Sequence, residues 1–401
     1  MIAVSEALER ILAGLRPTGA ETVALPDGWG RVLARPVAAR LTQPPVDVSA
    51  MDGYALRAAE ATLGARLRLA GASPAGRPFT EALRPGEAVR IFTGGALPPG
   101  ADAILLQEDA RAEDGHVTPT EAPRAGRWIR RAGLDFRLGD VLLQPGRRLS
   151  ARDVGLAAAA NHPWLHVHRR PRVAILATGD EIVLPGEALP PGGIVSSNAH
   201  ALSALVRAAG AEPLVLPIAG DDRAAIGASA EAAAGCDLIV TTGGASVGEH
   251  DLVQSALEPL GFSLDFWKIA MRPGKPLIWG GLRGAPLLGL PGNPVSAIVC
   301  AVVFLVPALR RLSGLPAAPV ETRSALLGRP LEANDRRQDY LRAELSRDTQ
   351  GRQVVTPFPV QDSSMLATLA RADALVVRAP GAPAAGANTE VEFVELSFLG
   401  V

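Results

Sequence analysis

The sequence predicts a multidomain protein of α/β plus β structure. At its centre we expect a doubly wound α/β domain, with flanking β domains and an N-terminal helical or mixed domain. Three observations lead to this fold class. At 401 residues, the chain is too long for one ordinary core. Residues 172–240 alternate continuous apolar strands with helical stretches, as in a parallel sheet covered on both faces. The regions on either side are rich in Pro, Gly and short alternating runs, which indicate β domains.

The N-terminal part opens with an amphipathic helix and continues as turn-rich sequence. Residues 140–170 return to a short strand and an alanine-rich helix, so we expect 1–40 and 140–170 to pack together as one discontinuous domain. Residues 41–139 predict a small β domain, and residues 317–401 predict a C-terminal β domain. The helical spacing at the start of the chain comes from Val4, Leu8, Ile11, Leu12 and Leu15.

The predicted α/β domain covers residues 171–316. Helices are expected after Asn198, after Asp222 and after the turn that ends at Pro294. The last of these contains the apolar run 295–309, which is too short to span a bilayer, so we expect a buried helix. The continuous apolar strands are 173–176, 213–216 and 237–240.

Composition narrows the function classes. A net charge of −1 argues against a nucleic-acid or anionic-membrane partner. Two cysteines in apolar surroundings do not suggest a disulfide framework. Glu6, Glu9 and Arg10 interrupt the apolar residues near the N-terminus, so no signal peptide is predicted there. We therefore expect a protein of the reducing cytoplasm.

Ligands of an open parallel sheet bind where the strands reach their carboxyl ends. Three loops lie at such ends, 177–181, 217–222 and 241–251, and each carries at least one acid. The last loop is the most specialised, because paired glycines let the backbone approach phosphate oxygens closely. Acids follow directly, which favours a phosphate together with a divalent cation. The plainer alternative is a tight turn that merely needs glycine. The loop supplies Gly243, Gly244, Ser246, Gly248 and Asp251.

Two further segments favour an anionic ligand. The turn from Arg272 to Lys275 places two cations around a proline, and Lys268 and Lys275 are the only lysines of the chain. Coincidence is the alternative to a selected pair of lysines. Asn293 precedes the long apolar helix, where it fits an N-cap and a ligand contact about equally well. In the predicted β domain, the segments 49–55, 91–95 and 127–135 are polar. Each of them, taken alone, is more typical of a turn or a solvated face than of a site.

Taken together, these segments resemble the molybdopterin molybdenumtransferase family, that is, the MoeA family, which includes the gephyrin E domain. The resemblance spans essentially the whole chain in the family's order. It rests on the following motifs: Thr178-Gly179-Asp180-Glu181, the glycine loop ending at Asp251, Arg272-Pro273-Gly274-Lys275-Pro276, Leu290-Pro291-Gly292-Asn293-Pro294-Val295-Ser296 and Ser49-Ala50-Met51-Asp52-Gly53-Tyr54-Ala55.

The resemblance implies an elongated, four-domain protein that dimerises, with a central molybdopterin-binding domain. The implied activity is Mg²⁺-dependent insertion of molybdate into adenylylated molybdopterin with release of AMP, and contact with the upstream adenylyltransferase is a further implied partnership. Glu181, Asp221 and Asp251 are the implied Mg²⁺ ligands. The implied catalytic residues are Asp52, Thr93, Asp135, Glu181, Asp221 and Asp251. The implied substrate-binding residues are Gly243, Gly244, Ser246, Gly248, Lys268, Arg272, Lys275, Asn293, Arg342 and Ser363.

Two departures and two alternatives accompany this resemblance. Arg272 stands where the family often has lysine, which keeps the charge and changes its geometry, and Thr242 stands where serine is common. One alternative is the preceding step, adenylyl transfer from ATP to molybdopterin, although its family lacks the extra β domains. The other is a non-catalytic scaffold, against which the retention of every acid position argues.

Overall fold

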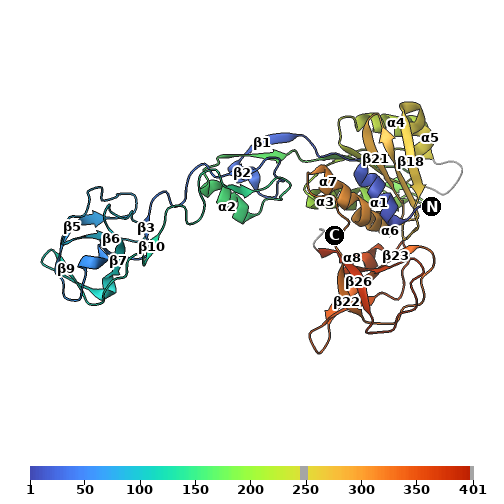
Figure 1. Cartoon of the computed structure of the whole chain (residues 1–401). Helices are drawn as coiled ribbons and strands as arrows, with labels where there is room; N and C mark the ends of the chain where they lie inside the picture. The colour runs from blue at the N-terminus through green and yellow to red at the C-terminus, as the bar shows by residue number, and fades with distance from the viewer. Residues whose placement is uncertain (244–251, 398–401) are drawn as a thin grey trace.

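The computed structural model describes residues 1–243 and 252–397. The molecule is elongated (Figure 1). A small β domain lies at one end, a mixed unit follows it, and the central α/β domain and the C-terminal β domain pack together at the other end. Both chain termini lie at that second end. The multidomain α/β plus β class is thus confirmed, whereas the predicted residue boundaries of the domains, apart from the grouping of the first helix, stay a prediction.

The distal β domain contains a six-stranded sheet in the order β7-β4-β6-β5-β9-β8. Its apolar side chains form a small separate core that includes Leu56, Val117 and Leu105. A short pair of strands, β3 and β10, adjoins it. The strands are β3 (Val48–Ser49), β4 (Gly53–Leu56), β5 (Leu67–Ser73), β6 (Glu87–Ile91), β7 (Ala103–Leu106), β8 (Ala110–Glu113), β9 (His116–Pro119) and β10 (Ile129–Arg130).

The mixed unit joins the two ends of the molecule and is made from two separate segments of the chain. Strand β1 pairs with β12, and β2 pairs with β11. Ser150 and Asp153 form a reciprocal capping box that starts the helix of this unit. Its elements are β1 (Ala20–Ala24), β2 (Val37–Ala38), β11 (Val141–Leu143), α2 (Ala151–Ala159) and β12 (Trp164–His168).

The first helix, α1 (Val4–Ala13), differs from the expected grouping. Its apolar face, including Leu8 and Ile11, is buried in the core of the central α/β domain and not against residues 140–170. Helical spacing shows that a helix has an apolar face, but it does not show which core covers that face. The discontinuous unit is therefore built around β1 and β12, without α1.

The central sheet has the order β16-β13-β17-β21-β20-β18. The first four strands are parallel, and β20 and β18 extend the sheet in antiparallel fashion. Alternate side chains of β13 enter two different cores, one shared with α3 and the other with α4 and α5, which confirms the doubly wound arrangement. The elements are β13 (Arg172–Ala177), α3 (Asn198–Ala208), β16 (Glu212–Val215), α4 (Arg223–Ala232), β17 (Leu238–Thr242), α5 (Leu252–Leu257), β18 (Phe262–Lys268), β20 (Pro276–Leu282) and β21 (Ala285–Leu290).

The long apolar helix of this domain is continuous from Pro294 to Leu312 and consists of α6 (Pro294–Cys300), a π-helical turn and α7 (Val306–Leu312). By length and composition alone it is the one helix of the described chain that is apolar enough to cross a membrane, yet 89% of its 18-residue apolar stretch is buried inside the protein. The expectation of a buried helix is confirmed. Pro307 lacks an N–H group to donate, and the wider π-helical turn directly precedes α7.

The C-terminal β domain is a six-stranded sheet in the order β19-β23-β24-β22-β26-β25, in which β23 also pairs with β25. Its edge strand β19 comes from the α/β segment of the chain, so this strand joins the two domains. The elements are β19 (Met271–Arg272), β22 (Arg323–Leu327), β23 (Gln338–Arg347), β24 (Gln353–Pro357), α8 (Leu366–Ala370), β25 (Ala374–Arg378) and β26 (Glu390–Glu395).

Candidate active site at the carboxyl ends of the central sheet

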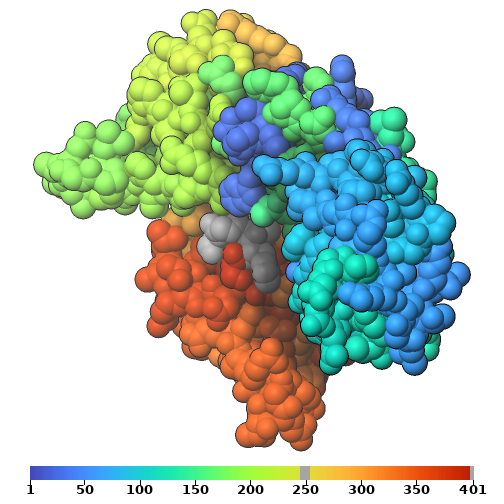
Figure 2. Space-filling view, turned by 90° about the vertical axis from the view of Figure 1, so that its left-hand side faces the viewer, coloured from blue at the N-terminus to red at the C-terminus, as the bar shows by residue number. Residues whose placement is uncertain are grey.

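A pocket of about 670 Å³ lies where β13, β17 and β21 end. Its size suits a small-molecule ligand. A projecting arm made of β14 (Ile182–Val183) and β15 (Ile194–Val195) lines one side, and Ser364 of the C-terminal domain contributes as well. The arm is the light green lobe that stands out from the surface in Figure 2. The other pocket residues include Ala177, Glu181, Asn198, Thr242, Gly243, Pro276, Gly292, Asn293 and Ser296.

Glycine is required at the end of β17. Gly243 has φ of 92°, and a Cβ atom there would lie 2.4 Å from the carbonyl oxygen of Thr178. Gly179 has φ of 144°, which also favours glycine, whereas a Cβ atom there would meet only the flexible carboxylate end of Glu181. The loops after β13 and β17 therefore approach each other closely, as their position at the same sheet edge predicts.

The loops that carry Glu181 and Asp221 are also joined. The Asp221 N–H donates to Oδ1 of Asp180 at 2.9 Å, and the Asp180 N–H donates to Oδ2 of Asp221 at 3.4 Å. Asp222 accepts from two backbone N–H groups and caps α4. Of the two predicted metal ligands within the described residues, Glu181 is exposed and lines the pocket, and Asp221 is exposed beside it in the next loop.

Among residues 1–243 and 252–397, no group of three or more His, Cys, Asp and Glu side chains is arranged to hold a metal ion. Mg²⁺ usually binds through one or two carboxylates together with waters and substrate phosphates. The hard oxygen donor of Glu181 in a pocket therefore fits such an ion in company with a phosphorylated substrate. Asp251, Gly244, Ser246 and Gly248 lie outside the described residues, so their predicted roles stay predictions.

Asn293 does not cap the long helix through its own side chain, although it occupies the N-cap position. Its Nδ2 instead donates to Oγ of Ser363 at 2.9 Å. The carbonyl oxygen of Ser363 accepts the N–H of Val295 at 3.3 Å, so a residue of the C-terminal domain satisfies one free N–H group at the helix start. The structure thus brings the two predicted residues Asn293 and Ser363 together.

Arg342 is almost completely buried, at 1% exposure. Its guanidinium donates to the side chain of Gln361 and to the carbonyl oxygens of Val360 and Met365. Burial lowers the pKa of Arg342. These contacts hold the segment that carries Ser363, so they favour an indirect role for Arg342 over contact with a substrate.

The two charged side chains of the cationic turn, Arg272 and Lys275, lie in different environments. Arg272 donates to Asp339 of the C-terminal domain through Nε at 2.9 Å and through a second guanidinium nitrogen, and the hydrogen bond to Asp339 raises the pKa of Arg272. Lys275 is exposed and precedes the pocket residue Pro276. The Nζ atom of Lys268 lies 3.6 Å from the ring centroid of Trp267, in a cation–π contact.

Of the three predicted site residues in the distal β domain, Asp52 and Thr93 are in contact and Asp135 is not part of that pair. Oδ1 of Asp52 accepts the backbone N–H of Thr93 at 2.7 Å and its hydroxyl at 2.8 Å, and the backbone bond is the main cause of a lowered pKa for Asp52. Asp135 is exposed and lines a separate hollow of the same domain next to Gly94. Figure 1 places this domain at the opposite end of the molecule from β21 and α6.

Sequence reasoning missed Asn198 as a site residue. It is the first residue of α3, and its Nδ2 donates to Oγ1 of Thr242 at 2.9 Å and to the carbonyl oxygen of Gly292 at 2.7 Å. The only local signal was a Ser-Asn pair before a helix, which reads as an ordinary helix start.

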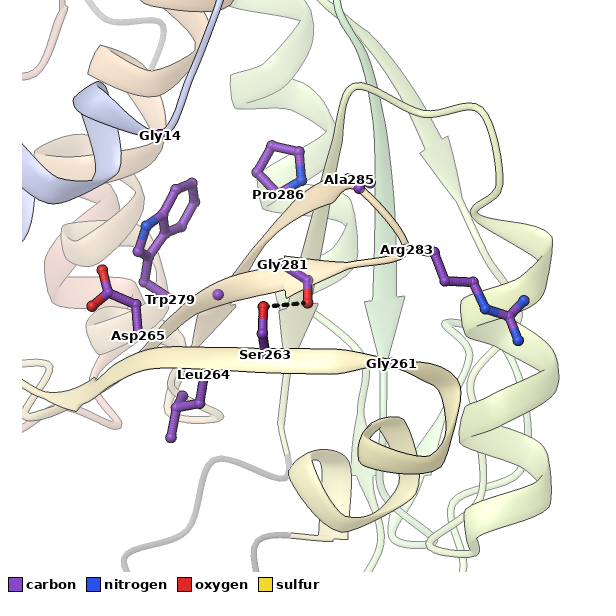
Figure 3. A pocket seen from close by; sticks show the side chains of 12 residues that line it. Gly14, Gly261, Ser263, Leu264, Asp265, Trp279, Gly281, Arg283, Ala285 and Pro286 are labelled. Atoms are coloured by element: carbon purple, nitrogen blue, oxygen red, sulfur yellow. Dashed lines mark hydrogen bonds between the residues drawn. The ribbon is translucent and has the colours of Figure 1, made fainter.

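A second hollow lies at the other end of the central strands, beside the turn between β20 and β21 (Figure 3). Gly14, Trp279 and Pro286 line it, and the guanidinium of Arg283 points away from the other labelled side chains. Ligands of open α/β sheets bind at the carboxyl ends of the parallel strands, whereas this hollow lies at the amino end of β21. The pocket at the carboxyl ends is therefore the better candidate.

Comparison with known proteins gives the same result. Residues 2–161 match the family described as MoeA N-terminal region (domain I and II), and residues 174–311 match the one described as Probable molybdopterin binding domain. Residues 324–396 match MoeA C-terminal region (domain IV). Fold and site therefore define a multidomain protein of molybdenum cofactor biosynthesis with a molybdopterin-binding α/β domain.

Individual relatives are similar over most of the chain. Molybdopterin molybdenumtransferase 2 of Mycobacterium tuberculosis is 38% identical over 94% of this chain and 95% of its own length. The molybdopterin molybdenumtransferase of Nostoc sp. is 40% identical over 71% of this chain and 68% of its own length. The crystal structure of a molybdopterin biosynthesis moea protein from Pyrococcus horikosii superposes with a TM-score of 0.86 at 30% identity, covering 98% of this chain and 99% of that one. The chain belongs to the molybdopterin molybdenumtransferase family.

Proposed function

We propose that the chain inserts molybdate into adenylylated molybdopterin in a Mg²⁺-dependent reaction that releases AMP. The observation that carries this proposal is the pocket at the carboxyl ends of the central sheet. There Glu181, the glycine at the end of β17 and the start of the long apolar helix converge. Such a site combines an acid for a cation with backbone suited to phosphate.

The chain's own residues would bind and orient the reactants. Glu181 and Asp221, with Asp251, would hold Mg²⁺ against the phosphoanhydride of the substrate, and the bound ion would act there as a Lewis acid. Lys275 and Lys268 would attract the phosphate groups and the molybdate oxyanion. The glycine-bearing loop would supply backbone donors to the terminal phosphate, with Gly243, Gly244, Ser246 and Gly248 as its members. Asn293 and Ser363 would frame the same pocket from the C-terminal side.

A homodimer supports this chemistry better than a single copy. Asp52, Thr93 and Asp135 belong to a domain that Figure 1 places far from the pocket. A second copy can bring those residues to the pocket, whereas the same copy does not do so in this structure. We also propose a cytoplasmic location and contact with the upstream adenylyltransferase, which would deliver the adenylylated substrate.

The decisive assay supplies purified protein with adenylylated molybdopterin, Mg²⁺ and molybdate, and measures AMP. We expect AMP release that requires both ions. Absence of AMP release would sink the transferase proposal. A requirement for ATP with unmodified molybdopterin would point to the adenylylation step instead, and binding without turnover would point to a scaffold.

Replacing the proposed ion ligands tests the site itself. We expect Glu181→Ala and Asp251→Ala each to lose most turnover, because removal of a metal-holding carboxylate removes charge stabilisation worth several kcal/mol. Thermal melts should stay close to wild type, since Glu181 is exposed. Wild-type turnover in both variants would remove the proposed ion site.

A further inference from the structure

Asn198 stands where three pocket-forming segments meet. It begins α3, and its amide nitrogen donates one hydrogen bond of 2.9 Å to Thr242 and one of 2.7 Å to Gly292. Thr242 ends β17, and Gly292 lies in the turn before the long apolar helix. The hydroxyl of Thr242 in turn donates to the carbonyl oxygen of Pro291 at 3.4 Å. One amide therefore links both sides of the pocket.

The orientation of this amide is fixed by its partners. A backbone carbonyl such as that of Gly292 only accepts hydrogen bonds, so the nitrogen of Asn198, and not its oxygen, must face it. The amide oxygen consequently points elsewhere; it is buried and has no hydrogen-bond partner among the described residues.

Helix capping does not account for Asn198. The N-cap position of α3 belongs to Ser197, and no side chain caps this helix start. Both donated bonds of Asn198 reach residues far along the chain, 44 and 94 positions away. The side chain therefore serves the two neighbouring loops and not its own helix.

We propose that Asn198 is a positioning residue, which holds the glycine-bearing end of β17 and the turn before α6 at the separation that the substrate requires. This inference rests on the proposed function of the pocket. Residues that orient a site in this way typically change activity by about 10- to 100-fold when they are replaced. We expect Asn198→Ala to lower kcat/KM within that range, mainly through a higher KM.

Asn198→Asp separates a hydrogen-bonding role from a merely structural one. The side chain keeps its shape, but a carboxylate cannot donate to the carbonyl oxygen of Gly292, whereas the protonated acid can donate once. An aspartic acid has an ordinary pKa of about 4, and burial beside a carbonyl raises it. Activity of this variant relative to wild type should therefore rise as the pH falls from 8 to 5, whereas the deficit of Asn198→Ala should stay constant.

His200→Ala is the matched control, since His200 is exposed on the same helix and does not line the pocket. It should keep wild-type kinetics. The inference is overturned if wild type is active and both Asn198 variants remain within twofold of it, or if the Asn198→Asp deficit is the same at every pH. A wild-type protein that releases no AMP would instead overturn the proposed function, which keeps the two failures distinct.

Discussion

The pocket of the central sheet and the Asp52–Thr93 turn of the distal β domain are built in different ways. The pocket gathers segments that are far apart in the sequence and ties them with side-chain bonds, such as the one between Asn293 and Ser363. Asp52 directly precedes β4 and Thr93 follows the end of its neighbour β6, so their bond is local to one small sheet of that domain. The pocket is therefore organised by the tertiary fold, whereas the turn of the distal domain depends on the single residue pair Asp52 and Thr93.

This difference shows what one copy of the chain provides. The pocket is linked to the C-terminal domain through β19 and through Ser363, so those parts belong to one body. Within the described residues, the distal domain is joined to the rest through the mixed unit (Figure 1). If Asp52 acts in the same reaction as Glu181, the two residues are expected to come from different copies.

Mixing two inactive variants tests that expectation and has the largest expected effect. Asp52→Ala and Glu181→Ala should each be nearly inactive alone. After unfolding and joint refolding at equal amounts, half of the dimers are mixed, and one of the two sites in each carries neither substitution. AMP release should then return to about a quarter of the wild-type rate. Refolding each variant by itself is the control, and a mixture that stays inactive would place both residues within one copy.

Two buried arginines of the C-terminal domain differ in whether they contact the segment next to the pocket. Arg342 donates to the 360–365 segment that carries Ser363, whereas Arg378 donates to the carbonyl oxygens of Glu332 and Pro383, elsewhere in the domain. Arg342→Met and Arg378→Met should each lower the free energy of unfolding by roughly 3 kcal/mol, because charged hydrogen bonds are lost. Only Arg342→Met should also raise KM, by about tenfold, through the displaced helix start.

Urea unfolding and steady-state kinetics on both variants provide the measurement. Equal effects on KM would mean that the 360–365 segment has no special connection to the pocket. Should Arg342→Met prove too unstable to assay, Ser363→Ala tests the same link, because it removes only the hydroxyl that accepts from Asn293.

The contact between the central and C-terminal domains should show a smaller effect. Arg272 holds Asp339 with two guanidinium nitrogens, and lysine offers one compact charge in place of that fork. Because the Arg272 side chain is 46% exposed, solvent screening limits the expected loss for Arg272→Lys to about 1 kcal/mol of unfolding free energy. Arg352→Lys, in a surface pair with Asp348, is the control and should change little. A loss no larger than that of the control would contradict the role of Arg272 as an interdomain tie.

Local patterns predicted the parts of the site that depend on strand order. Apolar runs located β13 and β17, and the rule for parallel sheets then placed Glu181 and Gly243 at one edge. Partners of Asn198 could not be predicted, because no local pattern reports bonds to residues 44 and 94 positions away. The predicted packing partner of α1 was wrong for a related reason. The helical spacing of its apolar residues fits any apolar surface, so it does not identify the core that covers the helix.

The antiparallel extension by β18 and β20 was also missed. The cationic turn lies between these two strands, and its charges and Pro273 are typical of a ligand-binding turn and not of a strand pair. For Arg342, family resemblance suggested a substrate contact, whereas its burial shows that the side chain is packed inside the domain. Burial of a charged residue depends on partners such as Gln361 that only the folded chain brings near.

The smallest expected effect concerns the isolated pair of the distal domain. Thr93 lowers the pKa of Asp52 first through its backbone N–H and then through its hydroxyl. A carboxyl with a lowered folded-state pKa contributes stability above its unfolded pKa of about 3.9, and this contribution is lost as the pH falls through the folded value. Thr93→Val removes only the hydroxyl bond, so the pKa of Asp52 should rise part of the way towards its ordinary value, and the stability lost on acidification should be smaller. Carboxyl-carbon NMR titration between pH 2 and 6 measures the shift, with Thr118→Val as the control; an unchanged Asp52 titration in Thr93→Val would show that the hydroxyl adds nothing to the pair.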